Sequence, residues 1–381
     1  MITTLIPTQC YDGETIYENR PISIEDGKII SFDTVKGAKE IKLDGLLCSG
    51  FIDTQVNGGG GFLLNENISI ETLNAMVKAH SQFGTSAMLP TLITSDLTKI
   101  EKTADLISKA IKQDMPGVLG VHFEGPHISG PKKGIHNQAQ IRPLGQQELD
   151  IYCRDDLGIK LLTLAPEHVS PETIKELVSH NVIVCLGHSN ADYETTRAAL
   201  QAGASGFTHL FNAMSAIESR APNMVGAALL DEDSWCGIIL DGHHVHPQVA
   251  KIAYRAKASQ KMLLVSDAMS TIGSDQLHFH FDGHDISLHK NKLTSKTGQL
   301  AGSALSMVEA VENARHMLDI PLNEAINMAS LYPASFLGIE QTHGRLGLGT
   351  AADFTLLCKE QSPLQVNQTW ISGKQIFNRG L

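Results

Sequence analysis

The sequence predicts an α/β protein: a (β/α)8 barrel of the TIM type with a small β-sandwich domain formed by both termini. Three observations lead to this prediction. Eight short apolar segments alternate with amphipathic helical segments through the middle of the chain. Polar residues suited to catalysis follow most of these segments, at the ends where such a barrel carries its active site. Both ends of the chain instead contain short β-like segments separated by turn residues.

The two ends of the chain, residues 1–48 and 345–381, are expected to pair into the small β domain. The first contains a hairpin pattern, Pro21–Ile30, which turns at an Asp-Gly pair. The second contains two strand-like segments, Phe354–Leu357 and Gln368–Ile371, and a Ser-Gly-Lys turn follows them. Two β-rich ends that flank a long α/β middle can form one small sheet domain.

The predicted barrel covers residues 49–344, in which strand and helix patterns alternate with short loops between them. Its eight strands are expected at Phe51–Val56, Ser86–Leu92, Val118–Phe123, Lys160–Leu164, Val182–Leu186, Gly206–Leu210, Cys236–Leu240 and Met262–Val265. Helices are expected at Ser69–Phe83, Asp96–Lys112, Pro171–Asn181, Asp192–Gly203, Pro247–Ser259, Leu305–Leu318 and Leu322–Leu337. Residues 277–298 have the pattern of an inserted hairpin, with Asp282 and Gly283 as its turn.

The composition excludes several classes of partner. The chain has 381 residues, 42% of them hydrophobic, and a formal net charge of -11. Such an acidic chain is a poor ligand for nucleic acid or an anionic membrane, although a locally basic pocket can still take an anionic substrate. No apolar run approaches the roughly 20 residues of a membrane span, and no signal peptide is expected. The six cysteines are scattered without a Cys-x-x-Cys pair, which indicates free thiols and a cytoplasmic location.

Two histidines follow neighbouring predicted strands and mark the centre of the expected site. His188 comes directly after Val182–Leu186 and one glycine, and His209 ends the next strand along the chain. The carboxyl ends of parallel strands meet at one rim of a barrel, so the two imidazoles are aimed at one region. Either histidine alone could be an ordinary hydrogen-bonded structural residue, but the pair at one rim favours a shared function.

Carboxylates are expected at the same rim. Glu124 follows the third strand, between Phe123 and Gly125, where a charge is costly unless it is paired or bound to a metal. Asp267 follows the eighth strand and could instead be a structural cap. Imidazole nitrogen and carboxylate oxygen are common ligands of divalent metals, and a catalytic site keeps a position for water. The polar residues at the other strand ends are Asp53, Gln55, Asn57, Asp241, His243 and His244.

Ten short segments occur in an order that resembles a known family. They are Gly50–Gly58, Leu89–Thr94, His122–Pro126, Lys133–Asn137, Leu164–Glu167, Gly187–Ala191, Thr208–Met214, Asp241–Val245, Ser266–Ala268 and Leu331–Ala334. Together they resemble the N-acetylglucosamine-6-phosphate deacetylases, a family of the amidohydrolase superfamily, and the resemblance covers nearly the whole chain. The resemblance implies a (β/α) barrel, a β domain built from both termini and a homodimer.

The resemblance also implies roles for individual residues. Glu124, His188 and His209 match the metal ligands of the family, and Asp267 matches its catalytic aspartate. The residues that match substrate contacts are His136 and His244 for the sugar, with His136 also able to assist catalysis, and Asn212, Ala213 and Arg220 for the phosphate. From the residues alone, His136 could be a solvated loop histidine and Arg220 a surface charge.

The chain departs from many amidohydrolases after the first strand. Those proteins carry His-x-His there and bind a second metal, whereas this chain has Gln55 and Asn57. Amides are poor zinc ligands, so one divalent metal per subunit is expected, with Gln55 and Asn57 left as contacts to water or to a weak second metal. Zn²⁺ is the expected ion, and Fe²⁺, Co²⁺ and Mn²⁺ are the alternatives.

The expected reaction is removal of the acetyl group from N-acetyl-D-glucosamine 6-phosphate, giving D-glucosamine 6-phosphate and acetate in amino-sugar catabolism. The first alternative is the galactosamine epimer of this substrate, or the substrate of another amidohydrolase, because the sequence does not place the contacts that read one hydroxyl. The second alternative is a metal-free scaffold that has kept the barrel and lost the chemistry. The expected partners are a phosphosugar substrate and a second copy of the chain.

Overall fold

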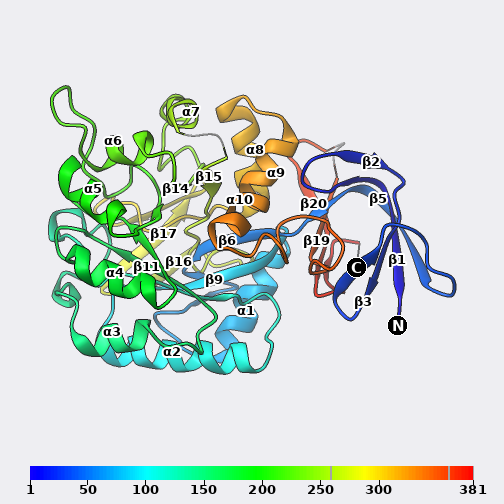
Figure 1. The fold of residues 1–381 in the computed structure, drawn as a ribbon, viewed down its shortest axis with the longest axis horizontal. Coiled ribbons are helices and arrows are strands. Elements are labelled where there is room, and N and C mark those ends of the chain that lie inside the picture. The colour runs from blue at the N-terminus through cyan, green and yellow to red at the C-terminus, as the bar shows by residue number, and fades with distance from the viewer. Residues whose placement is uncertain (258–259, 359–360, 381) are drawn as a thin grey trace.

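The computed structural model describes residues 1–257, 260–358 and 361–380, and it contains two parts (Figure 1). A barrel of strands surrounded by helices makes up most of the molecule. Beside it lies a part that consists mainly of β-sheet, and both chain termini lie there. Helices α8, α9 and α10 pack on the side of the barrel that faces this sheet.

The barrel contains eight parallel strands, which confirms the predicted fold. Their order in the sheet is β15-β14-β13-β12-β11-β10-β9-β6, so each strand pairs with its neighbour along the chain. The seam between the first and last strands is joined by a parallel bridge from Val56 to Ala268. The strands are β6 (Phe51–Val56), β9 (Thr85–Ile93), β10 (Gly120–Glu124), β11 (Ile159–Leu164), β12 (Val182–Leu186), β13 (Gly206–Phe207), β14 (Trp235–Ile238) and β15 (Met262–Leu264).

Helices on the outside of the barrel follow the predicted alternation. Several begin at the polar residue that the sequence places before the apolar pattern: Ser69, Asp96, Ser170 and Asp192 each accept a bond from a backbone N–H in the first turn. The helices are α1 (Ile70–Ser81), α2 (Leu97–Lys112), α3 (Gln146–Tyr152), α4 (Pro171–Ser179), α5 (Tyr193–Gln201), α6 (Asn223–Leu230), α7 (Pro247–Ala256), α8 (Met307–Leu318), α9 (Leu322–Ala329) and α10 (Leu331–Phe336). Two short 3-10 turns, Gly130–Lys132 and Gln138–Gln140, lie in the loop after β10. The predicted end of α7 at Ser259 lies outside the described residues.

The sequence prediction was wrong for the last helical segment. Leu322–Leu337 is not one helix but two, α9 and α10, which are separated at Ser330. Pro333 explains the break, because a proline within a helix lacks the N–H for the helical bond and clashes with the preceding turn. As the third residue of a new helix, Pro333 meets neither penalty. Helices α3 and α6 were not predicted.

Strand β13 is much shorter than the predicted Gly206–Leu210. After Phe207 the chain leaves extended geometry, and His209, Phe211 and Ala213 adopt positive φ angles of 36°, 77° and 52°. A strand cannot continue through left-handed residues. The same sequence therefore builds a turn at the mouth of the barrel instead of further strand.

The terminal segments form an eight-stranded sheet. β5 (Lys39–Ser49) pairs in parallel with β1 (Thr3–Tyr11) and antiparallel with β19 (Phe354–Cys358), so both ends of the chain share one sheet. Its other strands are β2 (Ile16–Glu18), β3 (Ile22–Glu25), β4 (Lys28–Ser31), β20 (Gln365–Ile371) and β21 (Lys374–Asn378). The predicted turn at Asp26 and Gly27 joins β3 to β4, and both residues have positive φ.

The inserted segment contains three antiparallel strands, one more than a simple hairpin. They are β16 (His278–Phe281), β17 (His284–His289) and β18 (Lys292–Ser295). Phe279, Phe281 and Ile286 pack with Ile93 and Ile135 in one apolar cluster. This packing holds the insert against the end of β9 and the loop that follows β10. Two further short strands, β7 (Gly58–Gly59) and β8 (Phe62–Leu63), form a small hairpin after β6.

None of the helices in the described ranges combines the length and the apolar character that crossing a bilayer requires.

Candidate active site

A cavity of about 230 Å³ lies at the carboxyl ends of the barrel strands. Residues predicted for the site from seven separate segments line it. They are Asn57, Glu124, His136, His188, His209, Asn212, Ala213, His244 and Asp267. The remaining lining residues include Ile93, Ile135, Ile239 and, from the segment that follows the inserted sheet, Gln299, Leu300 and Gly302.

Three of these side chains leave the ends of their strands through left-handed backbone. His188, His209 and Asp267 have φ angles of 47°, 36° and 52°. Left-handed φ is uncommon for residues other than glycine and costs about 1–3 kcal/mol where it is imposed. This geometry turns the chain sharply at the rim, so that the side chain points into the mouth of the barrel rather than along the strand direction.

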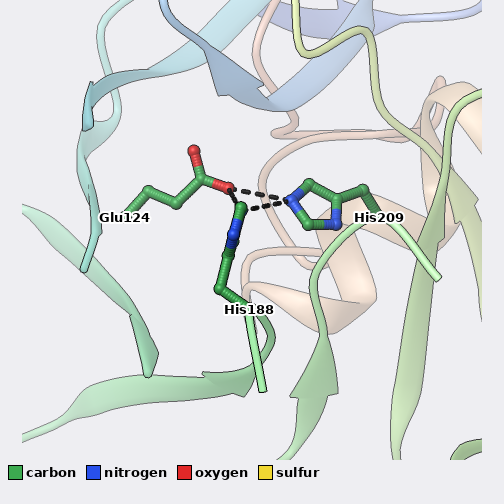
Figure 2. Close-up of side chains that lie close together, drawn as sticks. All are labelled: Glu124, His188 and His209. Atoms are coloured by element: carbon green, nitrogen blue, oxygen red, sulfur yellow. Dashed lines mark hydrogen bonds and ion pairs between the residues drawn. The ribbon is translucent and has the colours of Figure 1, made fainter. Parts of the chain in front are cut away.

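Glu124, His188 and His209 converge at one point, and Figure 2 shows their side chains directed toward one another. His209 Nε2 lies 3.0 Å from Glu124 Oε1 and 3.1 Å from His188 Nε2. His188 Nε2 lies 3.3 Å from the same carboxylate oxygen. All three residues are buried. Two imidazole nitrogens and one carboxylate oxygen within 4.8 Å of one another could hold a metal ion.

The tautomer of His188 supports this interpretation. Its Nδ1 lies 2.8 Å from the carbonyl oxygen of Lys132, which can only accept, so Nδ1 carries the proton. The Nε2 atom of a neutral His188 therefore directs a lone pair at the cluster. A backbone carbonyl that fixes the other ring nitrogen in this way is typical of a metal-binding histidine. The donor set and its protonation fit a divalent cation.

The charge of Glu124 is stabilised within this cluster although the residue is buried. Burial alone raises the pKa of a carboxyl group, but the contacts with the His188 and His209 imidazoles outweigh it and hold the pKa of Glu124 well below its usual value. The same contact with Glu124 outweighs burial at His209 and raises the pKa of that imidazole. The site thus keeps an anionic ligand in a water-poor environment.

Asp267 lies beside the cluster, and two amides hold one of its oxygens. Asn57 Nδ2 donates to Asp267 Oδ1 at 2.6 Å, and Gln55 Nε2 donates to the same oxygen at 3.2 Å. Gln55 Nε2 also donates to Glu124 Oε1 at 2.9 Å. Both acceptors are carboxylates, so each amide must present its nitrogen to them. Gln55 and Asn57 therefore act here as hydrogen-bond donors, and Gln55 lies behind the cavity instead of lining it.

Burial makes Asp267 a weaker acid than an exposed aspartate. Desolvation, followed by the nearby charge of Glu124, raises the pKa of Asp267 to about 6. Within the described residues its second oxygen, Oδ2, makes no hydrogen bond. A carboxylate with one oxygen anchored and the other free is suited to accept and return a proton.

His136 completes the cluster from the loop after β10. Its ring packs against that of His188 with centroids 4.2 Å apart, and its Nδ1 lies 2.7 Å from the hydroxyl oxygen of Thr94. Burial, followed by the neighbouring His188, lowers the pKa of His136 well below its usual value, so the ring is neutral. Gly125 is required next to this contact, because it has a φ of +81° and a Cβ there would lie 2.2 Å from the Thr94 hydroxyl.

The structure does not bring Arg220 into the cavity. This residue is exposed in the loop before α6 and is absent from the cavity lining, whereas Asn212 and Ala213, from the same β13–α6 connection, line the cavity. Of the three residues predicted for the phosphate, Asn212 and Ala213 therefore lie at this cavity, and Arg220 of the same chain does not.

Two polar contacts of the site were not assigned from the sequence. Thr94 holds His136, and Asp241 accepts from His244 Nδ1 at 2.7 Å. Both residues lie just after strands that were predicted correctly, so their place at the rim was a usable signal. Their partners could not be identified, because the pairing of side chains from different strands depends on the closed barrel.

Comparison with known proteins agrees with this geometry. Residues 46–376 match the model of the amidohydrolase family. An N-acetylgalactosamine-6-phosphate deacetylase of Shewanella sp. (strain ANA-3) is 49% identical over 333 residues, which cover 87% of this chain and 84% of that protein. An N-acetylglucosamine-6-phosphate deacetylase of Haemophilus influenzae is 35% identical over 341 residues, which cover 89% of this chain and 88% of that protein. The crystal structure of N-acetylglucosamine-6-phosphate deacetylase from Pasteurella multocida aligns with a TM-score of 0.93 and 33% identity, covering 98% of this chain and 99% of that one.

Proposed function

This chain belongs to the amidohydrolase family, and from that premise we propose that it hydrolyses N-acetyl-D-glucosamine 6-phosphate to D-glucosamine 6-phosphate and acetate. One observation carries the proposal. A buried Glu124, His188 and His209 cluster stands next to an aspartate whose Oδ1 is anchored and whose Oδ2 is free. Amide hydrolysis needs both an electrophilic centre for the carbonyl and a group that moves a proton from water to the leaving nitrogen.

We assign a divalent metal to Glu124, His188 and His209, with Zn²⁺ as the proposed ion because two imidazoles and a carboxylate are common zinc ligands. When bound, such a cation would supply Lewis-acid activation of water and of the acetyl carbonyl. The amides of Gln55 and Asn57 are engaged with carboxylates, which supports one metal per subunit.

In the proposed reaction Asp267 moves the proton. Its carboxylate takes a proton from the attacking water through Oδ2, while Asn57 and Gln55 keep Oδ1 in place. The protonated Asp267 then gives the proton to the amine nitrogen, because an amide nitrogen leaves poorly unless it is protonated. Its raised pKa, about 6, suits both halves of this transfer.

His136 is proposed to stabilise the negative charge that develops on the acetyl oxygen. The Thr94 hydroxyl can donate one hydrogen bond. We assign it to His136 Nδ1, at 2.7 Å, in preference to the Glu124 carbonyl oxygen, at 3.2 Å. This leaves an N–H on His136 Nε2, directed into the cavity. A neutral donor that is fixed in advance stabilises a developing oxyanion without reorganising during the reaction.

The substrate phosphate is proposed to bind the backbone at Asn212 and Ala213, with Arg220 donated by a second copy of the chain. Among the described residues that line the cavity, none is lysine or arginine. A phosphate dianion bound there would need a cation from elsewhere, and this need supports a homodimer. Removing the phosphate from the substrate is expected to lower kcat/KM by at least about 100-fold, since each charge-assisted bond contributes about 1.5–3 kcal/mol. We also propose a cytoplasmic location, which the six free cysteines support.

The galactosamine epimer is the second candidate substrate, and one observation favours it. The Shewanella relative, which is 49% identical, is named for N-acetylgalactosamine 6-phosphate, whereas the Haemophilus relative named for the glucosamine epimer is 35% identical. The two substrates differ only in the orientation of one hydroxyl, so the same metal cluster and the same Asp267 would serve both.

Acetate release from both N-acetylhexosamine 6-phosphates tests the proposal. Purified enzyme loaded with Zn²⁺ is expected to release one acetate per glucosamine substrate, with a higher kcat/KM than for the galactosamine epimer. A reversed preference would transfer the assignment to the second candidate. Absence of acetate release from either substrate, at full metal occupancy, would refute deacetylation of both.

A further inference from the structure

We propose that Asp241 is a positioning residue for this reaction, because it holds the His244 ring so that Nε2 faces the substrate cavity. The inference rests on the proposed deacetylase function, in which His244 contacts the sugar substrate. Asp241 lies three residues beyond the end of β14, and no metal or substrate contact was predicted for it.

Three hydrogen bonds converge on the Asp241 carboxylate. Oδ1 accepts the backbone N–H groups of His243 and His244, both at 2.8 Å. Oδ2 accepts from His244 Nδ1 at 2.7 Å. A carboxylate can only accept, so His244 Nδ1 carries a proton and donates it to Asp241 in this hydrogen bond. The bond keeps Nδ1, and not Nε2, directed at Asp241. One side chain therefore fixes the path of the loop and the orientation of the imidazole together.

The orientation matters because His243 and His244 serve different spaces. His244 lines the substrate cavity, whereas His243 lines a separate cavity of about 510 Å³ between α8, the inserted sheet and the terminal sheet. Asp241 lies in the wall of that second cavity. The turn that it closes thus decides which of two adjacent histidines enters the substrate cavity.

The environment keeps the Asp241–His244 pair ordered. The side chains of His244 and Asp241 are only 6% and 7% exposed, so little water competes for their hydrogen bond. The strand end before them is fixed by Asn313 of α8, whose Nδ2 donates to the Leu240 carbonyl oxygen at 2.7 Å. Burial raises the pKa of Asp241, but the hydrogen bond and charge of His244 outweigh burial, and the net effect is a lowered pKa. Within the described residues, His244 Nε2 has no hydrogen-bond partner and remains available to a substrate.

Asp241→Asn separates this role from a purely structural one. An asparagine oxygen can still accept both backbone N–H groups and keep the turn. Its NH₂ group, however, is a donor and would face His244 Nδ1, so the ring must change tautomer or rotate. A residue that only holds the loop would tolerate this change, whereas a residue that orients His244 would not.

The experiment is a double-mutant cycle in kcat/KM with Asp241→Asn and His244→Ala. Asp241→Asn alone is expected to lower kcat/KM by about 10-fold or more, the usual loss when a group that orients a functional histidine is changed. In the His244→Ala background the same change should cost less than about two-fold, because the ring through which Asp241 acts is absent. Equal losses in both backgrounds, or no loss in the first, would overturn the proposal.

Two further measurements keep the test decisive. Asp285→Asn is the matched control, since Asp285 accepts from His280 Nδ1 at 3.1 Å on the exposed inserted sheet and should leave kcat/KM unchanged. If Asp241→Asn does not fold, the parent enzyme still gives an answer: its proton spectrum should contain a downfield Nδ1–H signal that disappears in His244→Ala. Absence of that signal would contradict the assigned hydrogen bond. Failure of the deacetylase function itself would appear separately, as a parent enzyme that releases no acetate.

Discussion

At the scale of single residues, the site depends on which atom of each side chain is already engaged. Asp267 offers one oxygen to Asn57 and Gln55 and keeps the other free. His188 offers Nδ1 to a carbonyl oxygen and keeps Nε2 for the cluster. His244 offers Nδ1 to Asp241 in the same way. In each of these side chains a neighbour binds one polar atom, and the other polar atom is left free for the site.

The ionisation of Asp267 predicts an acid limb in the pH profile. A base must be unprotonated, and burial raises the pKa of Asp267 to about 6, so kcat/KM should fall as the pH drops through that value. The substrate phosphate also ionises at a pH of about 6. The residual activity of Asp267→Asn provides the control, because a limb caused by phosphate would persist in it. A parent profile that stays flat down to pH 5 would contradict the assignment.

The ligand set predicts the metal content. Purified enzyme should contain about one equivalent of divalent metal, and His188→Ala should lose most of it, because only two ligand atoms of the cluster remain. Lys175→Ala, an exposed change on α4, is the control and should keep full occupancy. Metal analysis after gel filtration provides the measurement. Two tightly bound equivalents, or full occupancy in His188→Ala, would contradict the single site.

At the scale of elements, the strand ends carry the chemistry and the helices hold the strands in place. Helix α8 begins with a reciprocal cap: Ser306 accepts from the Glu309 N–H, and the Glu309 side chain accepts from the Ser306 N–H at 3.0 Å. Through Asn313 the same helix holds the Leu240 carbonyl, two residues beyond the end of β14. Its N-terminal cap therefore stabilises an element that supports the His244 loop.

Ser306→Ala is expected to lower the free energy of unfolding by about 1 kcal/mol, the usual loss when a helix cap is removed. Alanine removes two bonds of the Ser306 hydroxyl, which accepts from the Glu309 N–H and donates to the Glu309 carboxylate at 2.6 Å, and the residue is buried. Ser170→Ala at α4, where the cap is exposed, should cost less. Denaturant unfolding of both variants gives the comparison. An equal or larger loss in Ser170→Ala would show that the cap of α8 contributes little.

The elements also show how far periodicity predicts structure. The eight barrel strands could be located because a buried parallel strand is a short apolar run between turn signals. β13 was predicted too long because left-handed geometry at His209 is imposed by the closed barrel and not by local sequence preference. The α9–α10 break was missed although Pro333 was a readable signal. The strand ends alone placed Glu124, His188, His209 and Asp267 at one rim, whereas their separate roles as metal ligands and proton carrier came from resemblance.

At the scale of the whole molecule, the chain passes from the terminal sheet into the barrel and returns from the barrel to the same sheet. β5 runs into β6 with only Gly50 between them, and β19 pairs with β5. The Gly50 N–H bonds to the Asp353 carbonyl oxygen at 2.9 Å, which links the entry and exit of the barrel. The cavity contains Asp267 and the Glu124, His188 and His209 cluster, whereas Arg220 lies outside it.

Subunit mixing tests whether Arg220 acts across a dimer. Arg220→Ala and Asp267→Asn chains are each expected to be strongly impaired. Co-expression should restore about a quarter of the parent activity, because half of a random mixture is hetero-dimer and one site in each such dimer is intact. If Arg220 acts within its own chain, no intact site forms and the activity of the mixture stays at the mean of the two defective enzymes.

Turnover and metal content, measured on one Asp267→Asn preparation, distinguish a proton carrier from a metal ligand at this position. Asparagine keeps the size of the side chain but removes the basic oxygen, so kcat should fall by about 10²–10⁴-fold while the metal content is retained. KM should change much less, because the proton transfer belongs to the transition state. Loss of the metal would identify Asp267 as a ligand instead, and activity within a few-fold of the parent with metal present would contradict its role as the proton carrier.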